Sequence, residues 1–219
     1  MEITITDRIH EVCPELVLAV ITCEVKNSVT SPALWGEMET EIQQFSANHS
    51  LEDINKRPEI AATRRVYRML GKDPNRYRPS AEALCRRIVR GIPIYQVNTL
   101  VDCINLVSIR SGYSIGGFDS DKIQGNIELG VGTSNDEFEA IGRGMMNVEG
   151  LPIYRDKIGG IGTPTSDNER TKISENTTHL LMIINGYDGK RNLLNAANYA
   201  IDLLGNYACL KQKKVTWIA

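Results

Sequence analysis

Apolar residues change their spacing about halfway along the chain, and this change predicts the order of the helices and strands. In the first half, Leu34, Met38 and Ile42 recur at four-residue intervals, which is typical of one buried helix face. Before them, residues 1–25 are expected to form strand, because Ile3 and Ile5 alternate with polar residues and 16–21 is a short apolar run. Residues typical of helix starts, such as proline or serine, and glycines typical of helix ends predict helices over 32–48, 58–70, 81–90 and 99–110.

The second half carries strand signals and many glycines. Ile127 and Leu129 alternate with polar or glycine positions, and short strands and turns are expected through 113–165. His179 to Ile184 is a continuous apolar run, as in a strand buried on both faces. A last helix and a last strand are predicted over 190–204 and 211–217. This pattern predicts one compact α/β (α+β) domain over 1–219.

Composition excludes several classes of protein. Among the 219 residues, 42% are hydrophobic and 24% are charged, which is ordinary for a soluble globular protein. No run approaches the ~20 apolar residues of a membrane span, and no signal peptide is visible. The five cysteines form no C-x-x-C, so we expect reduced thiols in a cytoplasmic protein. The three histidines lack metal-binding spacing, so no metal and no cofactor are expected.

Positive charge is concentrated in one window. The net charge is −2, yet residues 56–90 hold 11 basic and three acidic residues. This local excess on two successive helices predicts a face that binds a phosphate backbone. The alternative is a solvated helical face without a partner. The RNA-binding candidates are Arg64, Arg65, Arg68, Arg76, Arg78, Arg86, Arg87 and Arg90.

The segment 159–170, GGIGTPTSDNER, combines glycines with many hydrogen-bonding side chains. It lacks the G-K-[ST] of a phosphate loop, so nucleotide binding is not expected. Donors and acceptors packed this closely favour a pocket for a polar small molecule. A capped, solvent-exposed loop is the alternative. The ligand-binding candidates here are Thr163, Thr165, Ser166, Asn168 and Glu169.

Several segments together resemble a known family. The run 100–123, LVDCINLVSIRSGYSIGGFDSDKI, followed by Gly125, resembles the B3/B4 tRNA-binding and editing domain of the phenylalanyl-tRNA synthetase beta chain. A second run, ERTKISENTTHLLM, resembles a motif of that family in which a glutamate lies eight residues before a threonine, here Glu169 and Thr177. RYRPSAEALCRR upstream is similar to free-standing relatives of the module. The resemblance covers about 80–190.

The resemblance implies an α/β fold with mixed sheets around a central cleft that binds an amino-acid-like small molecule. Glu169 falls on the glutamate that reads the polar end of a tyrosine side chain, and Phe118 falls in the strand motif. The sequence departs from the family at two positions, because Gly116 replaces a histidine and Tyr95 replaces an arginine. With Gly117 beside it, Gly116 is expected to leave a larger and less polar pocket, and the alternative is that the two glycines only make a tight bend.

Two functions remain open. The first is a free-standing module that binds tRNA or aminoacyl-tRNA and hydrolyses a mischarged ester in trans. The second is a non-catalytic protein that binds RNA or an amino acid and has lost the editing reaction. No catalytic residue is assigned. Nothing resembles an ATP-binding core, so the chain is not expected to be a complete tRNA ligase. Neither DNA nor a membrane is an expected partner.

Overall fold

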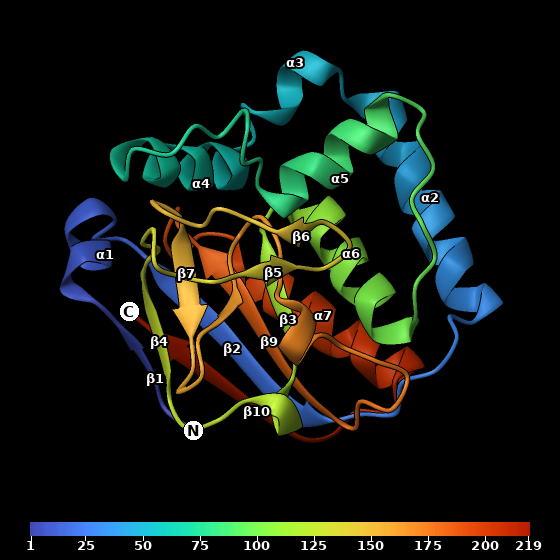
Figure 1. Ribbon diagram of the computed structural model, residues 1–219. Helices are drawn as coiled ribbons and strands as arrows, with labels where there is room; N and C mark the ends of the chain where they lie inside the picture. The colour runs from blue at the N-terminus through green and yellow to red at the C-terminus, as the bar shows by residue number, and fades with distance from the viewer.

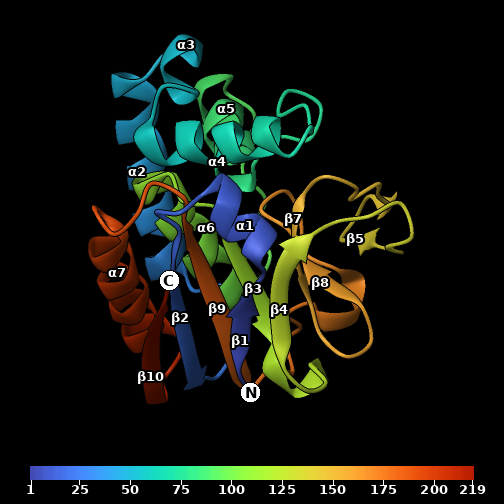
Figure 2. The ribbon, with the colours of Figure 1, turned by 90° about the vertical axis from the view of Figure 1, so that its left-hand side faces the viewer.

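Two four-stranded sheets and a layer of helices make up the fold, and the computed structural model describes residues 1–219. In Figure 2 the helices, the first sheet and the second sheet follow one another across the molecule. The first sheet is antiparallel in the order β10-β2-β9-β3. Its strands are β2 (Val17–Glu24), β3 (Ile115–Asp119), β9 (His179–Gly186) and β10 (Lys211–Ile218).

The second sheet has the order β1-β4-β7-β8 and is mixed, because β1 and β4 are parallel. A two-stranded ribbon lies beside it. The strands are β1 (Ile3–Ile5), β4 (Ile127–Val131), β7 (Pro152–Arg155) and β8 (Gly160–Gly162), with β5 (Glu139–Ala140) and β6 (Gly144–Met145) in the ribbon. The predicted α+β class is confirmed.

Helices cover one face of the first sheet and its upper end, except for α1 (Asp7–Val12), which lies beside β1 and β4 of the second sheet (Figure 1). The others are α2 (Pro32–Asn48), α3 (Leu51–Ile54), α4 (Pro58–Met69), α5 (Ser80–Val89), α6 (Thr99–Ser111) and α7 (Leu193–Tyr207). Two short 3-10 helices are η1 (Ser120–Lys122) and η2 (Glu169–Thr171). None of the helices is long and apolar enough to cross a bilayer.

Strand β9 separates the two main cores, as its apolar run predicts. Leu180, Met182 and Ile184 pack with the helices, whereas Leu181 and Ile183 pack toward the second sheet. All five side chains are fully buried. Because strand side chains alternate between faces, a strand with sheet on one side and helices on the other is apolar on both faces, as β9 is over residues 180–184.

The sequence predicted the starts of α2 and α6 correctly and the end of α7 wrongly. Ser31 and Asn98 cap α2 and α6, each accepting a backbone N–H from three residues further on. Helix α7 continues past Gly205 to Tyr207, because Gly205 keeps a negative φ. A glycine ends a helix only where the chain turns left-handed. Helix α1 (Asp7–Val12) corrects the expectation of strand over 1–25, and the short helix α3 carried no clear periodic signal and was not predicted.

Candidate ligand-binding cleft

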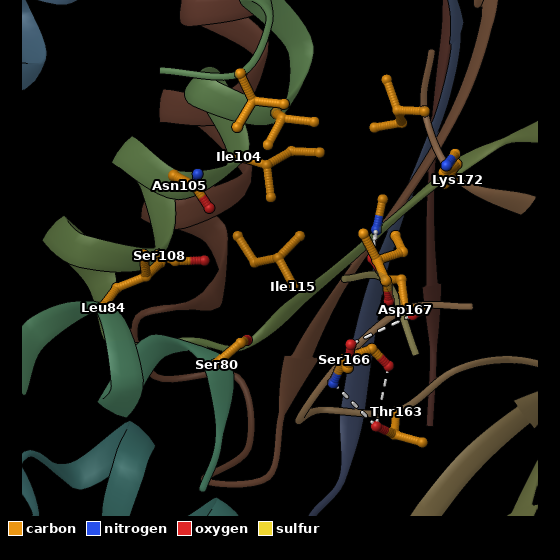
Figure 3. Close-up of a pocket in the computed structure, with 15 residues that line it drawn as sticks. Ser80, Leu84, Ile104, Asn105, Ser108, Ile115, Thr163, Ser166, Asp167 and Lys172 are labelled. Carbon is orange, nitrogen blue, oxygen red and sulfur yellow. Dashed lines mark hydrogen bonds between the residues drawn. The ribbon is translucent and has the colours of Figure 1, made fainter. Parts of the chain in front are cut away.

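A cavity of about 420 Å³ opens between α5, α6, β3 and the segment that follows β8 (Figure 3). Its volume is within the range of small-molecule sites. The walls are largely apolar, with Leu84 from α5, Ile104 from α6 and Ile115 from β3. Polar groups gather opposite α6, where Thr163, Ser166 and Asp167 line the cavity.

The polar segment is a folded turn and not a loose loop. The hydroxyl of Thr163 accepts the backbone N–H groups of Thr165 and Ser166 at 3.2 and 3.1 Å. It also donates to the carbonyl of Ser166 at 3.1 Å. The backbone N–H of Ser80 at the start of α5 bonds the carbonyl of Pro164 at 2.8 Å, which ties the turn to the helix. Thr163 and Ser166 line the cavity, and their role in binding a ligand stays a prediction.

Asp167 is the carboxylate that lines the cavity, and the sequence analysis did not select it. Its Oδ2 accepts the backbone N–H of Gly117 in β3 at 3.1 Å. Desolvation in this apolar surrounding raises the pKa of Asp167 to about 7, against a smaller lowering by that hydrogen bond. The signal available in the sequence was its place within a dense polar turn, two residues before Glu169.

Glu169 does not line the cavity, so the prediction that it does is wrong. Its carboxylate accepts the backbone N–H of Gly142 at 3.2 Å and the ammonium group of Lys172. Lys172 does line the cavity. Glu169 therefore positions the ammonium group of Lys172 from outside the cavity.

Two further loop candidates have local partners. Asn168 is buried and caps η2, where its Oδ1 accepts the N–H of Arg170 at 2.9 Å. The Thr165 hydroxyl lies 2.9 Å from the Tyr67 hydroxyl. Thr165 lines a second hollow beside the cavity.

The second hollow adjoins the cavity and is basic. It has a volume of about 390 Å³, and it shares Ser80, Leu84 and Asn105 with the cavity. No acidic residue lines it, whereas five arginines do: Arg78, Arg86, Arg87, Arg90 and Arg143. The first four lie in the predicted basic window. Arg143 lies in the turn of the β5–β6 ribbon, and a single arginine there did not indicate a binding site in the sequence.

The buried carboxylate of Glu82 organises part of this basic hollow. Its Oε1 accepts the Nε–H of Arg86 at 2.8 Å and lies 3.6 Å from Nε of Arg78. Glu82 thereby fixes two arginines on the side of α5 that faces the hollow.

The arginines of α4 do not take part, which corrects the predicted basic face. Arg64 is buried against Glu82, because its guanidinium ties α4 to α5. Arg65 pairs with Glu15, and its guanidinium is also 3.4 Å from the carbonyl of Tyr187. Arg68 and Arg76 are exposed but do not line the hollow. Helical spacing placed Arg64, Arg65 and Arg68 on one face of α4 but could not show which neighbours cover it, and Arg76 lies in the turn after this helix.

The glycine pair of β3 creates no additional room, contrary to the expectation for Gly116. A Cβ added at Gly116 would lie 2.7 Å from Cζ of Phe118, whose ring already fills the space. Gly117 does line the cavity, but a Cβ there would lie 2.4 Å from Cδ1 of Ile104. Phe118 is fully buried and supports the wall from behind.

Two residues of α6 differ in role. Asp102 is buried and accepts the Thr30 hydroxyl and the backbone N–H of Val97, so it ties the helix to the chain before it. Asn105 lies one turn further on and faces both the cavity and the basic hollow. Tyr95, by contrast, is 71% exposed on the loop that leads into α6. No group of three or more His, Cys, Asp or Glu side chains lies close enough to bind a metal.

These features define an α+β protein with an apolar cavity that opens beside a basic hollow. The sequence matches the B3/4 domain family over residues 62–208, and the chain belongs to that family. No curated protein matches the chain. Among solved structures, the chain is similar to that of an N-terminal fragment of the phenylalanyl-tRNA synthetase beta-subunit from Pyrococcus horikoshii. The sequence identity is 13%, the TM-score is 0.47, and the match covers 98% of this chain and 50% of that one. The chain thus spans half the length of that fragment.

Proposed function

We propose that this chain binds the aminoacylated 3′ end of a tRNA, with the amino acid in the cavity and the phosphates on the basic hollow. The observation that carries the proposal is that the two adjoin, because Ser80, Leu84 and Asn105 line both. A ligand with an amino-acid side chain at one end and phosphates at the other fits a cavity that adjoins a basic hollow. Membership of the B3/4 family supports a tRNA-related ligand. Such a role is a cytoplasmic one.

The cavity suits an amino-acid side chain better than a free nucleotide. Most of its wall area is apolar, and its polar lining residues include Thr163, Ser166 and Asp167 after β8, Asn105 and Ser108 on α6, and Lys172. A protonated Asp167 donates a hydrogen bond, whereas the ionised form accepts one or pairs with a cation. The arginines lie outside, over the adjoining hollow, where phosphates remain in contact with solvent.

Hydrolysis of the ester in trans is the proposed reaction, and Asp167 is its candidate base. A water molecule adds to the ester carbonyl carbon, its proton passes to the carboxylate, and the bond to the ribose oxygen breaks. That oxygen leaves as a hydroxyl after taking a proton. A pKa of about 7 is close to the value that makes a general base effective near neutral pH.

Binding without hydrolysis is the second candidate function. No histidine or cysteine lines the cavity. The backbone N–H of Gly117, which could have stabilised an oxyanion, is occupied by Asp167. Both observations favour a protein that holds the aminoacyl end without cleaving it.

The deciding experiment measures binding and deacylation separately over a panel of charged tRNAs. The wild-type chain should bind at least one charged tRNA more tightly than the same tRNA uncharged. If it also releases the amino acid, Asp167→Asn should slow release by about 100-fold or more while binding persists, as expected for loss of a general base. Asp202→Asn, an exposed change on α7, is the matched control. Equal affinity for charged and uncharged tRNA would contradict the proposal.

A further inference from the structure

Three exposed apolar or aromatic side chains lie within six residues of the loop between α5 and α6. Ile92 lines the basic hollow, Val97 lines the cavity, and Tyr95 stands between them in the chain. Apolar side chains exposed next to a cluster of arginines are not explained by packing of the core. Their position beside the cavity and the basic hollow makes this loop a candidate contact surface for a ligand.

The loop is held at both ends, so Tyr95 is presented from a fixed backbone. At its start, the N–H of Ile92 bonds the carbonyl of Arg87 at 3.0 Å. At its end, the N–H of Val97 bonds the buried carboxylate of Asp102 at 3.2 Å. The buried side chain of Ile94 anchors the middle.

Arg87 covers one face of the Tyr95 ring and leaves the other open. Its guanidinium carbon lies 4.5 Å from the ring centroid, and its Nε donates to the carbonyl of Pro93 at 2.5 Å. With 71% of Tyr95 exposed, the opposite ring face is in solvent. An aromatic ring backed by a guanidinium and flanked by further arginines is the arrangement that binds single-stranded nucleic acid, with bases stacked on rings and phosphates on cations.

We propose that the open face of Tyr95 stacks on an unpaired base of the RNA, while Arg86, Arg87 and Arg90 contact the adjacent phosphates. This inference rests on the proposed function and names the part of the ligand that is recognised, an unpaired 3′ extension. Ile92 lines the basic hollow and Val97 lines the cavity. An RNA 3′ extension stacked on Tyr95 between them therefore directs its terminal nucleotide toward the cavity.

The test compares two RNA hairpins, one blunt and one with a short unpaired 3′ extension that carries 2-aminopurine at its end. The wild-type chain should bind the extended hairpin more tightly and quench the 2-aminopurine fluorescence, which reports stacking. Tyr95→Ala should weaken binding of the extended hairpin by about 5- to 150-fold, the range of one base–aromatic stack. It should leave blunt-hairpin binding unchanged. Tyr95→Phe should retain the preference and the quenching.

Two comparisons separate this inference from the proposed function. Arg90→Ala with Arg143→Ala should weaken binding of both hairpins, because phosphate contacts do not depend on the extension. Leu194→Ala, an exposed apolar change on α7, should alter neither. If the wild-type chain binds neither hairpin, the proposed function fails. If it binds both and Tyr95→Ala changes nothing, or alters only the oligomeric state, then this inference alone is overturned and the loop is a protein contact.

Discussion

Arg64 and Glu82 form a buried ion pair, with Nη1 of the arginine 2.7 Å from Oε2 of the glutamate and both side chains almost fully enclosed. The guanidinium also bonds Oδ1 of Asn75 at 2.8 Å and the carbonyl of Pro74. The other oxygen of Glu82 holds Arg86. One carboxylate therefore joins Arg64 of α4 to Arg86 of α5, so the same residue stabilises the packing of the two helices and positions an arginine of the basic hollow.

Replacing this carboxylate should destabilise the protein strongly. Glu82→Gln leaves the charge of Arg64 buried without a counter-ion, which typically costs about 3–5 kcal/mol of unfolding free energy. Denaturant unfolding measures the loss. Glu11→Gln removes a partner of the exposed Arg8 instead and should cost less than about 1 kcal/mol. A comparably small loss for Glu82→Gln would show that the buried pair does not hold the two helices together.

RNA binding should depend on the arginines of the hollow and not on the whole basic window. Reversing Arg87, Arg90 and Arg143 to glutamate removes three positive charges that have no buried acid beneath them. Affinity should fall, and the slope of log affinity against log salt should decrease by about 2–3, near one per lost phosphate contact. Reversing Arg68 and Arg76, which are exposed outside the hollow, is the control. Equal losses in the two variants would mean that charge acts without a defined site.

The position of the helices could be predicted from the sequence because the relevant information is local. Ser31 before Pro32 and Asn98 before Thr99 satisfy the first free N–H groups wherever they occur. The apolar run of β9 likewise predicted a strand between two cores. These signals act within a few residues and need no knowledge of the tertiary contacts.

The site was predicted only in part, because its members depend on contacts distant in sequence. Spacing gave Arg64 and Arg68 the same face of α4, yet the approach of Glu82 buries the first and leaves the second exposed. The turn after β8 was identified as polar, but which of its carboxylates faces the cavity depends on contacts with distant residues. Asp167 accepts the backbone N–H of Gly117 in β3, whereas Glu169 is held outside the cavity by Gly142 and Lys172.

Stability should fall as pH rises through the range where Asp167 stays protonated only in the folded state. Burial raises its pKa to about 7, above the unfolded value of about 3.9. The folded state then binds more protons than the unfolded state, so unfolding free energy decreases from about pH 4 to about pH 7. Thermal unfolding across this range should show Asp167→Asn losing less stability than wild type as pH rises. Asp202→Asn should follow the wild-type curve. If the stability of Asp167→Asn and that of wild type changed equally with pH, the pKa of Asp167 would not be raised in the folded state.

Substitution of Gly116 should disrupt packing, and it should not fill an empty pocket wall. In β3 an added Cβ would lie 2.7 Å from Cζ of Phe118, and a Cβ at Gly162 would lie 2.6 Å from the same atom. The ring is therefore enclosed between two glycines and is fully buried, with no space to move into. Gly116→Ala is expected to cost about 1–3 kcal/mol of unfolding free energy, the usual range for overpacking.

The matched control is Gly36→Ala in α2, where an added Cβ meets nothing within 4 Å. That change should stabilise the protein by about 0.5–1 kcal/mol, because alanine loses less backbone entropy in a helix. Gly116→His, which would restore the family's histidine, should be less stable than Gly116→Ala, since its ring is larger and points at Phe118. A stable Gly116→His variant that gained tyrosyl-tRNA deacylation would show that Phe118 can move aside and that the wall is a ligand surface after all.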